Sequence, residues 1–208
     1  ELTWLALPDA LTPVETDDMA RLSSTVHWDL PVILPSGDLL HLLIWHATPP
    51  VFDGPEDRNG RRNHDEAAFW LRHFEGAFGD APDRFVLIGA ANLDPADGEG
   101  RPEALGQLLR HPLVTDPKPS SNGGVWKSRE DGGANLRHVG DPALDTADWP
   151  DGEGRPGNLR VDYVLPSSNL RVVGSGVLWP EDDGSLRRYV ETASRHRLVW
   201  VDIELVTE

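Results

Sequence analysis

Four short polar segments carry the side chains of this sequence that are best suited to acid–base and phosphate chemistry. His46 ends one apolar run, Asn92 follows a second, and Asp162 lies within a third. His196 stands in the segment 194–196, immediately before the last apolar run. An imidazole exchanges protons near neutral pH, and a neighbouring carboxylate orients it and makes it more basic. Each residue alone also fits a structural role, so it is the combination that points to a site.

The segments that must position these side chains are read as strands. Alternation over residues 22–34 places Val26, Trp28, Leu30 and Val32 on one side, and a turn follows at 35–38. The next run is apolar almost throughout, which is typical of a strand buried on both faces. We expect Leu198, Trp200 and Ile203 of the last strand to face a core. The expected strands cover residues 22–34, 39–47, 84–89, 159–165, 170–178 and 197–206.

Two helices and one long loop are expected between these strands. The first helix starts at Asn63-x-x-Glu66, a capping-box spacing, and the second covers 102–110 with proline in its first turn. The apolar stripe of the first helix comprises Ala67, Trp70, Leu71, Phe74 and Phe78. Residues 115–158 are rich in Gly, Pro, Asp and Ser and predict a long loop, of the kind that is usually functional or mobile.

Composition excludes several classes of protein. The chain has 208 residues, with 35 acidic and 19 basic side chains and a formal net charge of −16, which argues against an ordinary basic nucleic-acid-coating protein. A hydrophobic fraction of 38% with eight Trp excludes disorder of the whole chain. The absence of Cys leaves His and carboxylate chemistry, and no apolar run is long enough for a membrane span.

Segments 46–49, 89–95, 160–165 and 194–197 resemble, in order and in position relative to strands, the last four signature segments of the endonuclease/exonuclease/phosphatase superfamily. These deoxyribonuclease-like proteins are metal-dependent phosphoesterases. The resemblance covers residues 22–206 but only the C-terminal half of the family's domain. It implies an α+β fold (an α/β sandwich) of two packed mixed β-sheets flanked by helices. Residues 1–208 would supply about one half of that single domain.

The resemblance also implies roles for individual residues. His196 matches the final catalytic His, which acts as general base or stabilises the transition state, and Asp162 matches the acid that orients it. Asn92 matches the residue that holds the phosphate and the attacking water. His46 matches the His assigned to leaving-group protonation. The cofactor implied is a divalent metal ion, Mg²⁺ in the first place and Mn²⁺ or Ca²⁺ as alternatives.

The sequence departs from the family pattern at three points. Ala90 replaces the Asp of the Gly-Asp-x-Asn segment, and Arg195 replaces the Asp of Ser-Asp-His. The metal-binding Glu and an early Asn of the family would precede residue 1, so no metal ligand is assigned within this chain. The interpretation is therefore a metal-dependent phosphoesterase that is nuclease-like, with loss of activity through Ala90 left open. The alternative is a catalytically silent binding protein on the same fold.

Other clusters have two interpretations each. Arg61 lies among three Arg near His46 and fits either a substrate phosphate or a solvated loop, and Arg195 is likewise a candidate phosphate ligand. The acidic segment 94–100 fits a turn or a weak cation site. Trp126 and Trp149 fit either a stacking platform or anchors of the long loop.

Half of a two-sheet fold would leave one face of a sheet open to water. We therefore expect an N-terminal fragment of the same gene product as a partner, besides a phosphoester substrate that includes nucleic acid among its candidates. Relatives of this kind are often secreted or periplasmic, and the segment at residues 1–4 lacks the basic region of a signal peptide.

Overall fold

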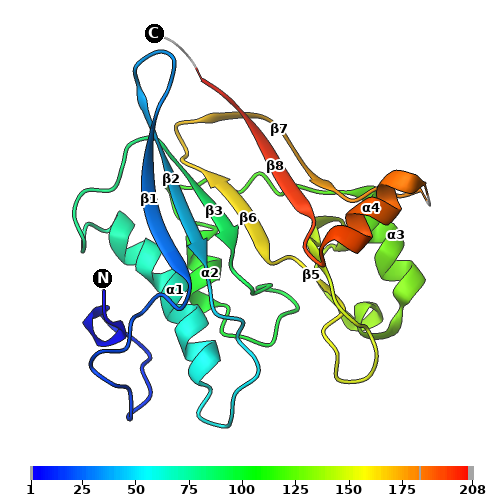
Figure 1. Ribbon diagram of the computed structural model, residues 1–208, viewed down its shortest axis with the longest axis horizontal. Helices are drawn as coiled ribbons and strands as arrows, with labels where there is room; N and C mark the ends of the chain where they lie inside the picture. The colour runs from blue at the N-terminus through cyan, green and yellow to red at the C-terminus, as the bar shows by residue number, and fades with distance from the viewer. Residues whose placement is uncertain (1, 183, 206–208) are drawn as a thin grey trace.

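The computed structural model describes residues 2–182 and 184–205 as a mixed α+β fold with three small sheets (Figure 1). The strands are β1 (Val26–Ile33), β2 (Leu39–His46), β3 (Phe85–Ala90), β4 (Ala147–Asp148), β5 (Asn158–Leu159), β6 (Asp162–Pro166), β7 (Arg171–Leu178) and β8 (Leu198–Glu204). The helices are α1 (Arg58–Phe74), α2 (Glu103–Leu108), α3 (Asn122–Asp131) and α4 (Ser185–Ala193). Short 3₁₀ turns cover Trp4–Ala6, Gly133–Arg137 and Pro142–Leu144.

The largest sheet has the strand order β1-β2-β3-β6 and is mixed, because only β2 and β3 run parallel. Helices α1 and α2 cover one face and bury Leu43, Trp45, Leu87, Tyr163 and Leu165 of the sheet. The second half of β2 is therefore buried on its helix side, whereas its continuous apolar sequence predicted burial on both faces; Leu42 and Ile44 on the other side are only half-buried.

The strand register brings the predicted site residues into one row. His46 at the end of β2 pairs with Ala90 at the end of β3, and Ala90 pairs with Asp162 at the start of β6. The two smaller sheets are β4-β5 and β7-β8, and the segment before β8 forms a bridge from His196 to Ala147 of β4. All four predicted segments thus meet at the lower end of the sheet in Figure 1.

Helix α1 begins at Arg58 rather than at Asn63, and it ends at Phe74, before Phe78. The predicted capping box is wrong because Asn63 and Glu66 lie inside the helix, where both side chains are buried.

Asn63 Nδ2 donates to the carbonyl oxygens of Thr48 and Ala91, at 2.7 Å each. The Glu66 carboxylate accepts from the backbone N–H of Ser24 and of Thr48, and burial raises its pKa. Helix α1 therefore holds the ends of β2 and β3.

The expected loop over 115–158 contains more structure than its composition indicates. It holds helix α3, two 3₁₀ turns and the short strand β4, and β5 begins at its end. Helix α4 between β7 and β8 is also missing from the sequence-based prediction. The last predicted strand position, Val206, lies outside the described residues. Among the described residues, no helix combines the length and apolar character needed to cross a membrane.

The face of the large sheet opposite α1 is only partly covered. Trp28 and Leu30 of β1 retain 64% and 49% of their surface, although alternation placed them on an apolar side. Their neighbours Leu42, Ile44, Ile88 and Val164 are half-buried. In β8 the prediction for Leu198 and Trp200 is wrong: they are 60% and 40% exposed, while Ile203 does pack in a cluster with Leu40. We call the β1–β2–β3–β6 surface opposite α1 the open face.

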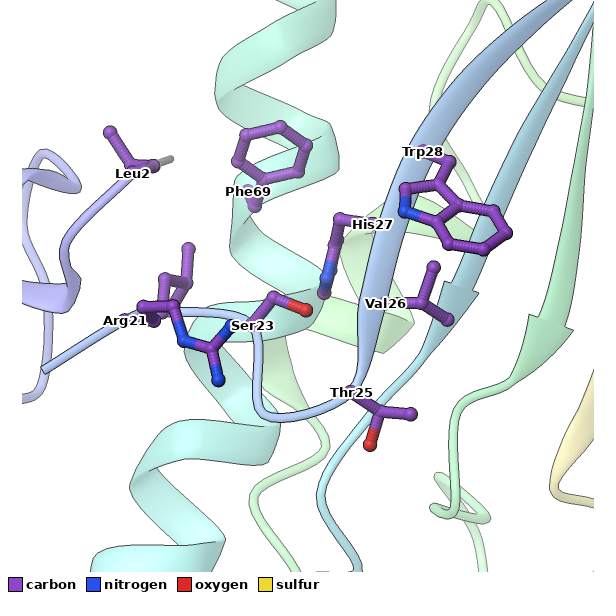
Figure 2. A pocket seen from close by; sticks show the side chains of 9 residues that line it. Leu2, Arg21, Ser23, Thr25, Val26, His27, Trp28 and Phe69 are labelled. Carbon is purple, nitrogen blue, oxygen red and sulfur yellow. The ribbon is translucent and has the colours of Figure 1, made fainter.

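A cavity of about 280 Å³ lies between the N-terminal segment, β1 and α1 (Figure 2). His27 lines it and is stacked on Trp70 with ring centroids 5.4 Å apart. Burial lowers the pKa of His27 to about 4, and its Nε2 donates to the carbonyl oxygen of Glu66. A neutral His27 is therefore part of the packing between β1 and α1.

Replacing Asn63 with Ala tests the role of α1. One buried and one partly buried backbone carbonyl lose their donor, so we expect the free energy of unfolding to fall by about 1–3 kcal/mol in urea titrations. The matched control is Gln107→Ala, because Gln107 is an exposed helical amide on α2. An equal effect of both substitutions would contradict the proposed tie between the strand ends.

Candidate active site

A cavity of about 770 Å³ opens at the end of the sheet where β2 and β3 finish. His46, Asn92 and His196 line it, so the structure brings three of the four predicted catalytic residues to one space. Asp162 lies just beyond this lining and contacts the ring of His196.

His196 and Asp162 form a close pair. His196 Nδ1 lies 2.9 Å from Asp162 Oδ2 and 3.0 Å from Oδ1, and the hydrogen bond to this carboxylate raises the pKa of His196. Because Nδ1 donates to the carboxylate, Nε2 is the ring nitrogen left to exchange a proton with a ligand. The pair thus has the arrangement expected for acid–base chemistry.

Thr146 supports this pair and was missed at the level of sequence. Its hydroxyl donates to Asp162 Oδ2 at 2.9 Å and accepts from the backbone N–H of Val161 and of Asp162, both at 3.0 Å. Thr146 is 1% exposed, so these bonds form away from water. It acts through Asp162 and is a positioning residue. Only its place in a segment read as a loop was visible in the sequence.

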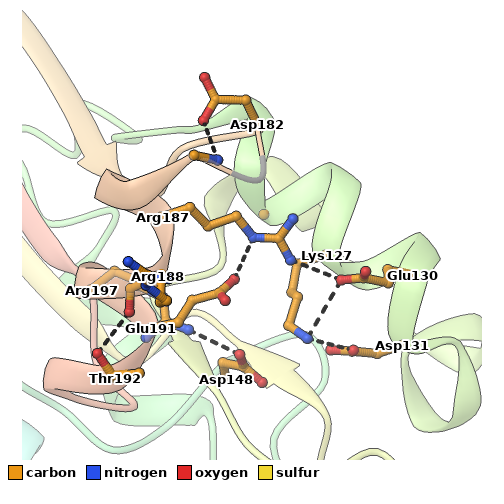
Figure 3. A network of polar contacts seen from close by, with 12 residues as sticks. Lys127, Glu130, Asp131, Asp148, Asp182, Arg187, Arg188, Glu191, Thr192 and Arg197 are labelled. Carbon is orange, nitrogen blue, oxygen red and sulfur yellow. Dashed lines mark hydrogen bonds and ion pairs between the residues drawn. The ribbon is translucent and has the colours of Figure 1, made fainter.

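The backbone that carries His196 is fixed to β4. The backbone N–H of Arg197 donates to the carbonyl oxygen of Thr146 at 2.7 Å, and the backbone N–H of Asp148 donates to the carbonyl oxygen of Arg195 at 3.0 Å. Arg197 also binds the Asp148 carboxylate at 2.9 Å, in the charged network between α3, α4 and β4 that Figure 3 shows. The ring of Trp149 packs edge-on against His196, with centroids 5.5 Å apart. Movement of the imidazole is therefore restricted on two sides.

Asn92 and His46 form the opposite part of the site. Asn92 Nδ2 donates to the carbonyl oxygen of Ala47 at 2.8 Å and lies 3.2 Å from His46 Nε2. Asn92 adopts a left-handed backbone with φ of 51°, which turns the chain directly after β3. Gly89 allows the close approach of β2 and β3, because a Cβ there would lie 1.8 Å from the oxygen of Trp45.

The described residues do not complete a metal site. No group of three or more His, Asp or Glu side chains among them is arranged to hold a metal ion. Ala90 places a methyl group between His46 and Asp162 in the row, where the family pattern has a carboxylate. The Asp162 carboxylate is itself engaged by Thr146 and His196. Any metal bound here would need further ligands.

The two predicted substrate-binding arginines do not line this cavity. Arg61 donates to the backbone oxygens of Glu56 and Leu11, at 3.1 and 3.3 Å. Arg195 is exposed, and its backbone oxygen accepts from Asp148 and Arg197. The geometry thus provides no support for either as a phosphate ligand, and their role stays a prediction.

Of the other sequence candidates, Trp126 and segment 94–100 have structural roles, and Trp149 belongs to the candidate site. Trp126 is an anchor, since the guanidinium of Arg187 lies 3.7 Å from its ring centroid. Trp149 lines the cavity. In segment 94–100, Asp94 accepts from the N–H of Ala96, and Asp97 accepts from Val139 and Gly140, as in a structural turn.

Replacing Asp162 with Asn tests the pair. The loss of the carboxylate removes the interaction that raises the pKa of His196, so this pKa falls. The measurement is an NMR titration of the His ring protons, with Glu153→Gln, an exposed acidic position, as the control. An unchanged pKa for His196 in the Asn variant would contradict the pairing.

Comparisons with known proteins find one matching family and similar solved structures. Residues 10–196 match the Endonuclease/Exonuclease/phosphatase family, whose members typically use divalent metal ions. The crystal structure of an endonuclease/exonuclease/phosphatase from Beutenbergia cavernae DSM 12333 is similar with a TM-score of 0.52 and 16% identity, over 85% of this chain and 38% of that chain. An endonuclease/exonuclease/phosphatase family protein from Leptotrichia buccalis C-1013-b has a TM-score of 0.44 and 17% identity, over 85% and 52%.

No curated protein matches. The likeness to the Beutenbergia cavernae structure concerns the fold, and this chain spans only 38% of that protein's length. The order of the segments, the row of His46, Ala90 and Asp162, and the family match agree with one another. The chain therefore belongs to the endonuclease/exonuclease/phosphatase family.

Proposed function

We propose that this protein hydrolyses phosphodiester or phosphomonoester bonds with a divalent metal ion, in the manner of a nuclease. The supporting observation is the cavity lined by His46, Asn92 and His196, with Asp162 bonded to His196. Mg²⁺ is the metal we propose, because the oxygen and nitrogen groups at this end of the sheet include no sulfur. Its carboxylate ligands would come from outside these residues, since the described groups do not complete a site.

The chain's own groups can bind a phosphate and move a proton. The raised pKa of His196 enlarges its cationic fraction near neutral pH, so Nε2 can donate a charge-assisted hydrogen bond to a phosphate oxygen. In the neutral form the same nitrogen can accept a proton from water. His46, held beside Asn92, is placed for proton transfer to a leaving group.

We also propose that a further part of the same gene product, N-terminal to this chain, covers the open face. Soluble proteins rarely leave a contiguous apolar surface exposed, and Trp28 and Leu30 project from this one. A second β-sheet packed there would give the two-layer arrangement that a sheet with an apolar face requires. The same part is the proposed source of the missing metal ligands.

A catalytically silent binding protein is the second candidate. It is favoured by the methyl group of Ala90 and by the lack of a metal-ligand cluster among the described residues. Such a protein would use the same cavity to bind a phosphorylated ligand without turning it over.

Activity of the full-length protein decides between the two. We expect Mg²⁺- or Mn²⁺-dependent hydrolysis of bis-p-nitrophenyl phosphate and plasmid DNA, reduced by about 10²–10⁴-fold in His196→Ala. Thr192→Ala on α4 is the control. Absence of metal-dependent turnover in both the native protein and the Ala90→Asp variant would reject the phosphoesterase and favour the silent protein.

The substitution Trp28→Lys tests whether a partner covers the open face. In the full-length protein we expect Trp28→Lys to promote dissociation or unfolding, because a charge would be buried without a partner. Exposed Trp200 on β8 supplies the control substitution Trp200→Lys. A 208-residue chain that is monomeric and cooperatively folded alone, and unaffected by Trp28→Lys, would contradict the proposed partner.

A further inference from the structure

A connector of four residues, 194–197, carries His196 between helix α4 and strand β8. The connector follows the last residue of α4 and precedes the first residue of β8. Ser194 and Arg195 are exposed, whereas Arg197 is buried. The contacts of this buried side chain therefore bear on where the imidazole lies.

Arg197 fastens the connector through its guanidinium, because the side chain is 1% exposed and folds back on the residues before it. Its Nη1 donates to the carbonyl oxygens of Ser194, at 2.6 Å, and of Arg195, at 3.2 Å. Its Nη2 donates to Asp148 Oδ2 of strand β4 at 2.9 Å (Figure 3). One planar group with donors in a fixed fork thus joins the two residues before His196 to β4.

The guanidinium is also held from one side by an aromatic ring. Its central carbon lies 4.4 Å from the ring centroid of Trp179, which is 3% exposed. The backbone N–H of Arg197 donates to the carbonyl oxygen of Thr146, and the hydroxyl of Thr146 donates to Asp162. Both members of the His196–Asp162 pair are therefore connected to the residue that precedes β4.

The ion pair between Arg197 and Asp148 is costly for a purely stabilising contact. Within the described part of the chain, Nε of Arg197 is buried without a hydrogen-bond partner. Burial lowers the pKa of Arg197 and raises the pKa of Asp148. Buried ion pairs add little net stability compared with apolar side chains of similar volume. The geometry that this pair imposes is therefore a better explanation for it than the stability it adds.

The charge of Arg197 acts on His196 in the opposite direction to Asp162. The hydrogen bond to Asp162 raises the pKa of His196, and the nearby guanidinium lowers it. Loss of the positive charge alone would raise the pKa of His196, whereas displacement of the imidazole from Asp162 would lower it. An electrostatic role and a positioning role thus predict changes of opposite sign.

We propose that Arg197 is a positioning residue, which holds the His196 imidazole against Asp162 by clamping the connector 194–197 to Asp148. The proposal rests on the phosphoester-hydrolysing function proposed above, because this pair supplies its acid–base group. Arg197 does not line the cavity, so it acts through the backbone of the connector and not on a ligand.

The test combines Arg197→Met with Asp148→Asn in the full-length protein. Both charges of the pair are removed together, so no buried charge is left alone. We expect an NMR titration of the His ring protons to show a lower pKa for His196 than in the native protein. The other titratable groups that line the cavity stay the same: His46, Asp97, Glu99, Arg137, His138 and Arg155.

The same variant has a kinetic readout. We expect the kcat for bis-p-nitrophenyl phosphate to fall by about 10- to 100-fold, because a small displacement of the imidazole is enough for such a loss. The KM stays within about twofold of the native value, since no group that lines the cavity has changed.

A second variant, Arg197→Lys, keeps the charge and replaces the fork with one flexible ammonium group. It decides the question if circular dichroism shows that the double variant does not fold. We again expect a lower pKa for His196, which a role of the charge alone does not predict.

The matched control combines Arg187→Met with Glu130→Gln. Arg187 is likewise buried, binds Glu130 at 2.9 Å and lies 3.7 Å from the ring centroid of Trp126. Within the described residues, its side chain makes hydrogen bonds to Glu130 and Glu191 and none to the connector. We expect the pKa of His196 to keep its native value in this control.

Two results would overturn the clamp. An unchanged or raised pKa of His196 in the folded Arg197 variant would leave no positioning role. An equal fall in the Arg187 control would show general loosening of the network between α3, α4 and β4. Absence of hydrolysis by the native protein concerns the proposed function instead, because the pKa of His196 is measured without turnover.

Discussion

The geometry of the candidate active site depends on a buried amide inside helix α1. Asn63 donates to Thr48 and to Ala91, which lie just beyond the ends of β2 and β3. Two parallel strands are thus joined just beyond the end of their ladder, through the carbonyl oxygens of Thr48 and Ala91. His46 and Asn92 lie within two residues of these anchor points, so their separation is set by the helix as well as by the sheet.

The strands were predictable because their signal is local. Apolar runs such as 39–47 and 84–89 bury one face beneath α1 and α2, and the chain shows this directly as hydrophobic content. The side of β8 was not predictable in the same way. Leu198 and Trp200 alternate as a core-facing pair would, yet the structure packs the other side. Alternation identifies two faces and does not say which of them finds a partner.

Helices α3 and α4 were missed because charged groups, rather than a continuous apolar stripe, hold them together. Arg187 of α4 binds Glu130 of α3 and covers the ring of Trp126, while Lys127 binds Asp131. Gly123 and Gly124 at the start of α3 further weaken its local signal. At the site, a family resemblance was enough to pair Asp162 with His196. Thr146 carried no such signal, because its role depends on a contact that folding alone creates.

The bonds that orient the imidazole join distant parts of the chain, and this has a kinetic consequence. Thr146 and Asp162 are 16 positions apart, and Asp162 and His196 are 34 apart. Closing such loops costs entropy before any contact compensates for it, and non-local contacts of this kind form slowly. The imidazole is oriented only when the segment between α4 and β8 has docked on β4. The proton transfer that we propose for His196 therefore requires the contact between segment 194–197 and β4.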